Sequence, residues 1–342
     1  MDLFDNAYVW RNDPAVAFAA FVTNPDFLRL SHRKKAGNTG PIRTSSAKVY
    51  TAMFNRFLRW LVDQKEHKSI YDITDEDVMA FLEQRTKDGV RILEGATIRR
   101  QYLSLLERVF NHLKIDPNPA RHFLFSAIRQ RSSGLLGHDE PKSLLDNDAQ
   151  CIAFMRALPA AGAGDPGSTT GWKKRRDCGM QALMLGAGLK VSQVINLEID
   201  AIGKKDLSGS VPVTVSVKAS GGTVRTHQTW LRPYAVDHVL AWVEERKRLG
   251  VPGKRLFPAN LVEDRGLNPA SLYRQVKASF ARAGIDIQRE GGRTLRNSFA
   301  VRELKAGSNA ELVSEFLGHR ELRSLEPYQL EVHRKKHKGF DR

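Results

Sequence analysis

The residues that could carry chemistry lie in the second half of the chain, and most of them are cationic. Arg293 and Arg296, in the segment "GGRTLRNSFAVRELKAGSN", are three residues apart and can point the same way at the start of an expected helix. Guanidinium groups gathered at the positive end of a helix repel each other unless an anion lies between them. An isolated pair of this kind is more often two solvated arginines, so the pair alone does not establish an anion site.

His319, Tyr328 and Lys218 each have an ordinary structural explanation and a chemical one. His319 follows the expected end of a helix and can be a capping or surface group, but its ring can also donate a hydrogen bond to a phosphate oxygen. Tyr328 follows Pro327, a residue that favours the first turn of a helix, and is either a core aromatic or a nucleophile. Lys218 ends an expected strand and is either solvated or a proton donor.

The first half of the chain predicts a small helical domain over residues 44–130. A buried stripe at a four-residue interval is expected from Val49, Met53, Phe57 and Leu61. Further helices are expected to start at Thr74, which Asp77 follows after three residues, and at Thr97. Residues 1–43 are expected to be a basic N-terminal extension, because "SHRKKAGNTGPIR" is rich in glycine and basic residues and is typical of an arm or linker.

A second domain is expected over residues 143–342, after a polar linker at 131–142. Its segment "VPVTVSVKASGGTVRTHQTWL" alternates valines with polar residues on both sides of a turn, which predicts a β-hairpin. The rest of the domain has helical periodicity. The predicted fold class is therefore mainly α with a small antiparallel β-hairpin (α+β), in two domains.

No cofactor is expected from the sequence. The loop "PAAGAGDPGSTTGWKKRRD" contains glycines at the spacing of a dinucleotide-binding turn, but no strand precedes them and Pro166 interrupts them. Cys151 and Cys178 fit no metal-binding spacing and indicate a reducing compartment.

The charge balance of the chain favours a polyanionic partner. Among 342 residues, 54 are Lys or Arg and 38 are Asp or Glu, a formal net charge of +16. Such an excess raises the local concentration of nucleic acid. An anionic membrane surface is the competing partner, but no apolar run approaches the ~20 residues of a spanning helix. The N-terminus also lacks the features of a signal peptide, so a cytoplasmic protein is expected.

Taken in order, these residues resemble the tyrosine recombinase (phage integrase) family. The C-terminal box of that family appears here as "RTLRNSFAVRELKAGSNAELVSEFLGHRELRSLEPYQL", with 23 residues from Arg296 to His319 and 9 from His319 to Tyr328. The segment "RRDCGMQALMLGAGLKVSQVINLEIDAI" is similar to the family's first box, and residues 44–130 look like its core-binding (SAM-like) domain. The resemblance extends over roughly 300 residues.

The resemblance implies a role for each of these side chains. Tyr328 would attack a DNA phosphate and form a 3′-phosphotyrosine, while Arg296 and His319 would hold the phosphate oxygens. Lys218 would protonate the leaving oxygen as a general acid. Because the covalent link stores the phosphodiester, the resemblance implies neither a metal nor a nucleotide cofactor. It implies double-stranded DNA as the partner, self-association on DNA as a tetramer, with a partner recombinase as a further option, and a cytoplasmic, nucleoid-associated location.

Two positions depart from the family's catalytic set. Lys190, in "AGLKVSQ", replaces the first arginine and cannot make its two parallel hydrogen bonds. Arg293 replaces a histidine and cannot relay a proton near neutral pH. Asn297 also differs from the usual histidine, at a position that is less directly catalytic. Two functions stay open: a recombinase with reduced activity, or a paralogue that no longer cleaves DNA and acts as a DNA-binding accessory or regulatory protein.

Other DNA- and RNA-binding functions explain less of the sequence. A transcription factor accounts for the charge but not for the spacing of His319 and Tyr328. Topoisomerase IB and telomere resolvases use similar chemistry, but the helical domain is more similar to that of integrases. Nothing in the sequence beyond its charge supports an RNA-binding enzyme. Contacts with the DNA backbone are expected from Arg99 and Arg100, near a helix start, and from Lys48.

Overall fold

The computed structural model divides the chain into two compact units, Met1–Glu140 and Pro141–Arg342. The structure describes residues 3–29, 42–63, 68–89, 92–93, 96–121, 123, 143–145, 147–158, 171–218 and 223–338. The division between the units falls within the expected linker, but residues 131–142 lie outside the described residues.

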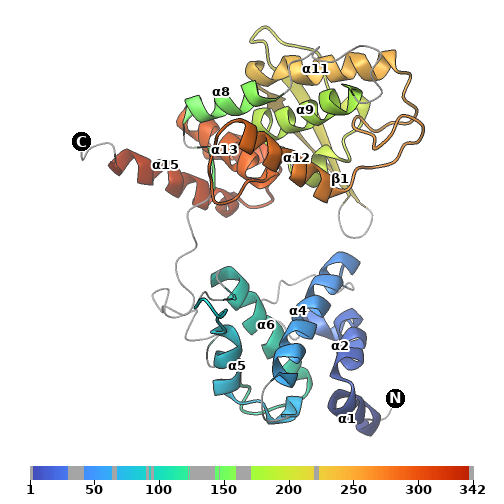
Figure 1. Cartoon of the computed structure of the whole chain (residues 1–342), viewed down its shortest axis with the longest axis vertical. Coiled ribbons are helices and arrows are strands. Elements are labelled where there is room, and N and C mark those ends of the chain that lie inside the picture. Colours follow the sequence, from blue (N-terminus) through green and yellow to red (C-terminus); the bar gives the residue numbers. More distant parts are fainter. Residues whose placement is uncertain are drawn as a thin grey trace. The chain divides into compact units, whose positions relative to one another are not determined.

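The described part of the first unit is helical (Figure 1). Its α-helices are α1 (Leu3–Asn12), α2 (Pro14–Thr23), α3 (Asp26–Arg29), α4 (Thr44–Val62), α5 (Asp75–Leu82) and α6 (Ala96–His112), with a 3₁₀ turn at Ile70–Asp72. The predicted start of α5 is confirmed, because Thr74 and Asp77 form a reciprocal capping box. In α4, Met53, Phe57 and Leu61 are buried as expected, whereas Val49 is exposed.

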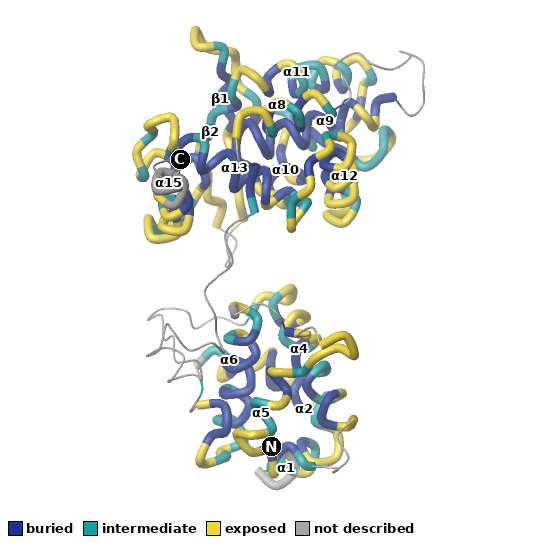
Figure 2. The backbone as a smooth tube through the Cα atoms, turned by 60° about the vertical axis from the view of Figure 1, so that its left-hand side comes forward, coloured by how far each residue is buried: buried dark blue, intermediate teal, exposed yellow. Residues whose placement is uncertain are grey.

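Residues 3–29 are packed structure, which corrects the prediction of an N-terminal extension. Trp10 of α1 and Phe18 of α2 are fully buried in the same core as α4, α5 and α6. The Phe18 ring stacks on Phe54 of α4, with ring centroids 4.2 Å apart. Figure 2 shows the buried sides of these helices facing one another. The aromatic residues of this segment bury more apolar surface than a solvated arm would tolerate. The basic segment 30–41 lies outside the described residues.

The second unit surrounds a two-stranded sheet with helices, as the sequence predicts. Its elements are α8 (Asp148–Ala157), α9 (Gly171–Gly186), α10 (Val191–Val194), a 3₁₀ turn (Ile199–Ala201), β1 (Val211–Lys218), β2 (Val224–Leu231), α11 (Pro233–Arg248), α12 (Pro269–Arg282), α13 (Gly292–Lys305), α14 (Ala310–Phe316), a 3₁₀ turn (Leu322–Leu325) and α15 (Glu326–Lys338). Within the described residues, no helix is both long and apolar enough to cross a membrane.

The strands β1 and β2 form the predicted antiparallel hairpin, in a register that pairs Val211 with Leu231 and Lys218 with Val224. Val211, Val213 and Val215 are buried, so the alternation of the sequence marks the inner face of the sheet correctly. The connecting residues 219–222 lie outside the described residues.

Helix α9 runs through the middle of the second unit, and α11 and α13 pack against it (Figure 1). A Cβ at Gly186 would lie 2.4 Å from Cβ of Ala235, so only glycine allows α9 to approach α11 this closely. Arg232, just before α11, donates from Nε to Glu303 Oε1 of α13 at 2.7 Å. Residues 171–177 belong to α9 and not to the loop that the sequence predicts, whereas 159–170 lie outside the described residues.

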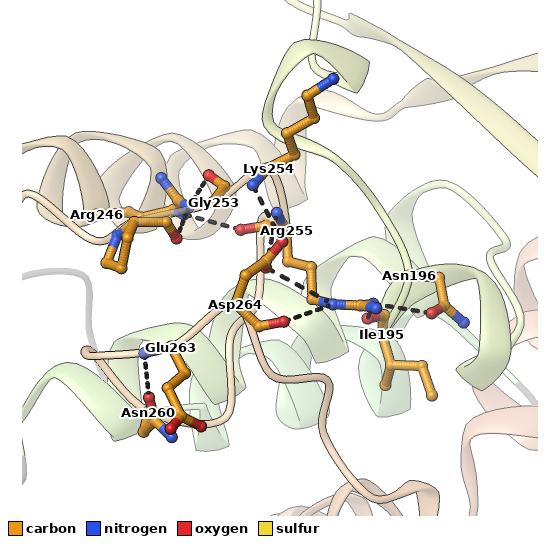
Figure 3. Close-up of polar contacts among 10 residues, drawn as sticks. Ile195, Asn196, Arg246, Gly253, Lys254, Arg255, Asn260, Glu263 and Asp264 are labelled. Atoms are coloured by element: carbon orange, nitrogen blue, oxygen red, sulfur yellow. Dashed lines mark hydrogen bonds and ion pairs between the residues drawn. The ribbon is translucent and has the colours of Figure 1, made fainter.

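Two arginines, the buried Arg246 and the partly exposed Arg255, fix the segment that follows α11 (Figure 3). Arg246 donates through Nε to the carbonyl oxygen of Arg255 and through Nη2 to that of Gly253, both at 2.9 Å. The Arg255 guanidinium in turn donates to Asn196 Oδ1 at 2.9 Å and pairs with Asp264 at 3.6 Å. Because Asn196 lies two residues after the end of α10, these bonds connect the end of α10 to the end of α11.

Candidate functional site

The candidate site is built around the Arg296 side chain, which is only 4% exposed. Its Nη1 donates to the carbonyl oxygen of Gly188 at 2.6 Å, and its Nη2 donates to that of Leu317 at 2.7 Å. Nη2 also lies 3.3 Å from Nε2 of His319. One guanidinium thus joins α13, the α9–α10 loop and the segment after α14, and its orientation is fixed before any ligand binds.

Helix α13 buries Arg296 but leaves Arg293 exposed. Arg296 lies in the second turn and is covered by the Gly188 loop and the end of α14, whereas Arg293 in the first turn is exposed. The two arginines therefore differ in exposure, and a shared anion for them stays a prediction. The helix begins after Gly291, and Thr294 in its first turn is buried and donates from Oγ1 to the carbonyl oxygen of Arg289.

The loop between α9 and α10 depends on Gly188. Its φ of +69° lies in the left-handed region, and a Cβ there would lie 2.4 Å from Cδ1 of Phe299. Two residues later, the main-chain N–H of Lys190 donates to Gln193 Oε1 at 2.7 Å. The same Oε1 lies 3.4 Å from Nη1 of Arg296. Gln193 therefore positions Lys190 next to Arg296 through the backbone of Lys190.

Tyr328 is both a packed aromatic and a member of the site. It lies in the first turn of α15, is 6% exposed, and packs in a small core with residues of α13 and α14. Its hydroxyl donates to Asn297 Oδ1 at 3.2 Å, and Asn297 Nδ2 donates to the carbonyl oxygen of Ser143 at 3.1 Å. The ring centroids of Tyr328 and His319 are 6.3 Å apart. Asn297, which the sequence marks only as a departure, thus positions the hydroxyl.

The site holds closely spaced cations. Burial lowers the pKa of Arg296 to about 10, and the neighbouring Tyr328 acts in the opposite direction. Burial and then Arg296 lower the pKa of Lys190. Within the described part of the chain, no carboxylate forms an ion pair with either residue. An oxyanion placed between them would relieve their repulsion, as a phosphate would.

Lys218 and the expected DNA contacts of the first unit differ in exposure and in their hydrogen-bond partners. Lys218 is exposed at the end of β1, where it pairs with Val224, and the hydrogen bonds of the described residues include none from its side chain. Lys48 of α4 is exposed and Arg100 of α6 is half-buried. Arg99 is only 3% exposed and donates to the carbonyl oxygen of Leu93 at 2.8 Å, which does not fit the expected phosphate contact. Its position on the inner side of α6 is the physical reason.

The sequence interpretation missed His227 of β2, which lies close to the cluster. Its pKa is lowered by burial and then by Arg296 and Lys190. The available signal was strand parity, because His227 shares the inner face of β2 with the buried Thr229 and Leu231. Among the described residues, no group of three or more His, Cys, Asp or Glu could hold a metal ion.

The chain is similar in sequence to known tyrosine recombinases. Residues 168–333 match the model of the phage integrase family. The chain is 25% identical over 291 residues to the tyrosine recombinase XerC of Agrobacterium fabrum (strain C58), covering 81% of this chain and 80% of that protein. It is 24% identical over 296 residues to the tyrosine recombinase XerD of Yersinia pestis, covering 82% and 84%.

Two solved structures are similar in fold. The XerH site-specific recombinase bound to palindromic difH substrate, in a post-cleavage complex, matches with a TM-score of 0.66 and 17% identity over 96% of each chain. The Tn1549 transposon integrase in complex with a circular intermediate DNA matches with a TM-score of 0.53 and 16% identity, covering 90% of this chain and 94% of that one. Both likenesses extend over the two units of the chain.

Proposed function

We propose that this chain, which belongs to the tyrosine recombinase (phage integrase) family, is an enzyme that cuts and rejoins DNA through a 3′-phosphotyrosine intermediate. The observation that carries the proposal is the meeting of Arg296, His319 and Tyr328 in one site from three separate segments. Donors that are fixed in advance stabilise a transition state without reorganisation at the moment of reaction.

In the proposed reaction, the Tyr328 hydroxyl gives up its proton to solvent, its oxygen attacks the scissile phosphorus, and the bond from phosphorus to the 5′ oxygen breaks. Tyr328 must first release Asn297 Oδ1, its hydrogen-bond acceptor at 3.2 Å. Arg296 and His319 would bind the non-bridging oxygens, with Lys190 beside them as a second cation. Lys218 would protonate the leaving oxygen, which requires the hairpin end to approach the DNA. A 5′ hydroxyl from another strand then reverses the attack and rejoins the DNA.

Unit 1 would supply binding to the DNA backbone. Lys48 and Arg100 keep accessible positions for phosphate contacts, whereas Arg99 does not. Exchange between two duplexes needs several protomers, so we propose self-association on DNA, with a tetramer as the expected assembly. Leu330 of α15 is 60% exposed and is a candidate contact with a neighbouring protomer. Work on chromosomal DNA would place the protein in the cytoplasm at the nucleoid.

A second candidate function is that of an impaired paralogue that binds DNA and assists a partner recombinase. Two observations favour it: Lys190 stands where the family has an arginine, and Arg293, which replaces a family histidine, is exposed. The hydrogen bond that holds the Tyr328 hydroxyl and the intact contacts of Arg296 favour the active enzyme instead.

The two functions are separated by trapping the covalent intermediate. The full chain would be incubated with duplexes that it selects from a random library by affinity, each nicked so that cleavage releases a short fragment and religation is blocked. We expect a protein–DNA adduct that survives denaturing electrophoresis.

The matched control is Tyr328→Phe, which removes only the hydroxyl. We expect this variant to bind the same duplexes with nearly unchanged affinity and to give no adduct. A wild-type chain that binds these duplexes and forms no adduct would favour the accessory protein.

A further inference from the structure

His227 lies on the side of β2 that faces the unit interior. It pairs with Val215 of β1, and its neighbours at two-residue spacing on the same face, Thr229 and Leu231, are both fully buried. Thr229 donates from Oγ1 to the carbonyl oxygen of Ala187 at 2.9 Å, which fixes this part of β2 against the α9–α10 loop. The position of His227 is therefore set by the sheet and by the loop that carries Gly188 and Lys190.

The imidazole of His227 lies directly against Gly318. A Cβ at Gly318 would be 2.6 Å from Cε1 of His227, 2.7 Å from Nδ1 and 2.8 Å from Nε2, so the ring covers the Cα of that glycine. Gly318 has a φ of +60° and stands between Leu317, whose carbonyl oxygen holds Arg296, and His319. His227 is thus packed on the residue that joins two contacts of Arg296.

The charged groups around His227 come from several elements, and they are cationic. Arg296 of α13 and Lys190 at the start of α10 both act on the imidazole electrostatically. His319, after α14, is the titratable group of the third neighbouring segment, and Arg225 lies two residues away on β2. The hydrogen bonds among the described residues include none to the His227 ring. A half-buried imidazole therefore lies near two cations, and no hydrogen bond to another described residue occupies its ring N–H.

We propose that His227 is a further phosphate ligand of this site, donating a hydrogen bond from its ring N–H to a DNA phosphate oxygen. The proposal rests on the proposed function insofar as the ligand is a DNA phosphate, but it holds equally for an active recombinase and for a DNA-binding paralogue. It adds a residue from the β-hairpin to a cluster otherwise formed by helices and the segments beside them.

The charge state of His227 makes the proposal measurable. Burial, then Arg296 and Lys190, lower the pKa of His227 to about 4, so the ring is neutral near pH 7 without DNA. A bound phosphate would offset both cations and favour the imidazolium, which raises this pKa. Binding of DNA should therefore take up a proton from solvent at His227, and affinity should rise as the pH falls through the pKa of the bound state.

The size of the effect follows from linkage. If phosphate restores the ordinary histidine pKa of about 6.5, affinity at pH 5.5 should exceed that at pH 7.5 by about tenfold through His227 alone. The gain saturates below the pKa of the free protein, about 4. Other groups also titrate in this range, so the quantity to measure is the difference between the wild type and a variant without this imidazole.

The test compares the full-length wild type with His227→Gln on a duplex that the chain selects from a random library. Affinities would be measured at pH 5.5 and 7.5 at constant ionic strength. His333→Gln, at an exposed position of α15, is the matched control. The quantity compared is the ratio of the affinity at pH 5.5 to the affinity at pH 7.5. We expect this ratio to be about tenfold larger for the wild type and for the control than for His227→Gln. An equal pH dependence in all three proteins would overturn the proposal.

A direct measurement on the wild type keeps the test decisive if His227→Gln does not fold. The Cε1–H signal of His227, assigned through its contact with Gly318, would be titrated by NMR with and without the duplex. A pKa raised by DNA supports the proposal, and an unchanged pKa in the bound state overturns it. Failure of the proposed enzyme function would appear separately, as a missing Tyr328 adduct in the nicked-duplex assay.

Discussion

Replacing Lys190 by arginine should accelerate formation of the covalent complex. The main-chain N–H of Lys190, and not its side chain, bonds to Gln193 Oε1 at 2.7 Å, so the substitution preserves the start of α10. Only the cationic head changes, from a point charge to a planar fork that can bind two phosphate oxygens in parallel. The residue is exposed, which leaves room for the larger head.

The expected gain is about tenfold. One additional charged hydrogen bond contributes about 1.5–3 kcal/mol, and each 1.4 kcal/mol in the barrier changes a rate by about tenfold. The upper end of this energy range is not expected. Burial and then repulsion by Arg296 lower the pKa of Lys190, and Arg296 would repel a guanidinium at this position as well. We therefore expect an acceleration close to the lower end of this range.

The assay is single-turnover formation of the adduct at a subsaturating concentration of the nicked duplex, where the rate reports the pKa values of the DNA-free protein, followed as a function of pH. Because the pKa of Lys190 is lowered, the wild type should lose this cation, and with it rate, at a lower alkaline pH than an ordinary lysine would. Lys190→Arg should remove that alkaline loss, since arginine stays protonated.

The matched control is Lys204→Arg, at an exposed position of the same unit. A Lys190→Arg variant that folds and binds normally but is no faster than wild type, with the same alkaline loss, would refute the assignment of Lys190 to the phosphate site.

Three further outcomes test other parts of the chain. Lys218→Ala should slow cleavage of ordinary DNA much more than of DNA with a 5′-thiolate leaving group, which needs no proton; equal defects would show that Lys218 is not the general acid. Removing the charges of Lys48 and Arg100 together should lower the slope of log affinity against log salt by about 2, and an unchanged slope would exclude both from the interface. Gly188→Ala should lower the free energy of unfolding by about 2–5 kcal/mol in urea titrations, because the cost of a left-handed backbone at alanine adds to the cost of the clash with Phe299. A loss below about 1 kcal/mol would mean that the Phe299 side chain shifts easily.

Local patterns in the sequence determined the elements of the fold. The valine alternation of β1 specified which face is buried, and Thr74 with Asp77 specified the start of α5. These signals succeed because a side chain's direction within one strand or one helical turn follows from backbone geometry alone. The order and spacing of Arg296, His319 and Tyr328 carry the resemblance to the tyrosine recombinases, and the structure brings these three side chains close together.

Other parts of the fold and site were decided only by tertiary packing. Arg99 is a charged residue that is buried, and Val49 is an apolar residue that is exposed. Each helix turns its most apolar face as a whole toward its neighbours, so single residues can lie on the opposite side from the one that their type favours. The aromatic residues of α1 and α2 join the first core through contacts with α4 that no local pattern specifies.

In the site, too, local sequence patterns predict some features and tertiary packing decides others. Arg293 and Arg296 are close in sequence yet separate in environment, because the Gly188 loop and the end of α14 cover only the second. His227 comes close to Arg296 because β2 packs beside α14, so its role depends on contacts between residues distant in the chain. A periodic pattern fixes the direction of a side chain within its own element, whereas the partners that meet it are set by how the elements pack.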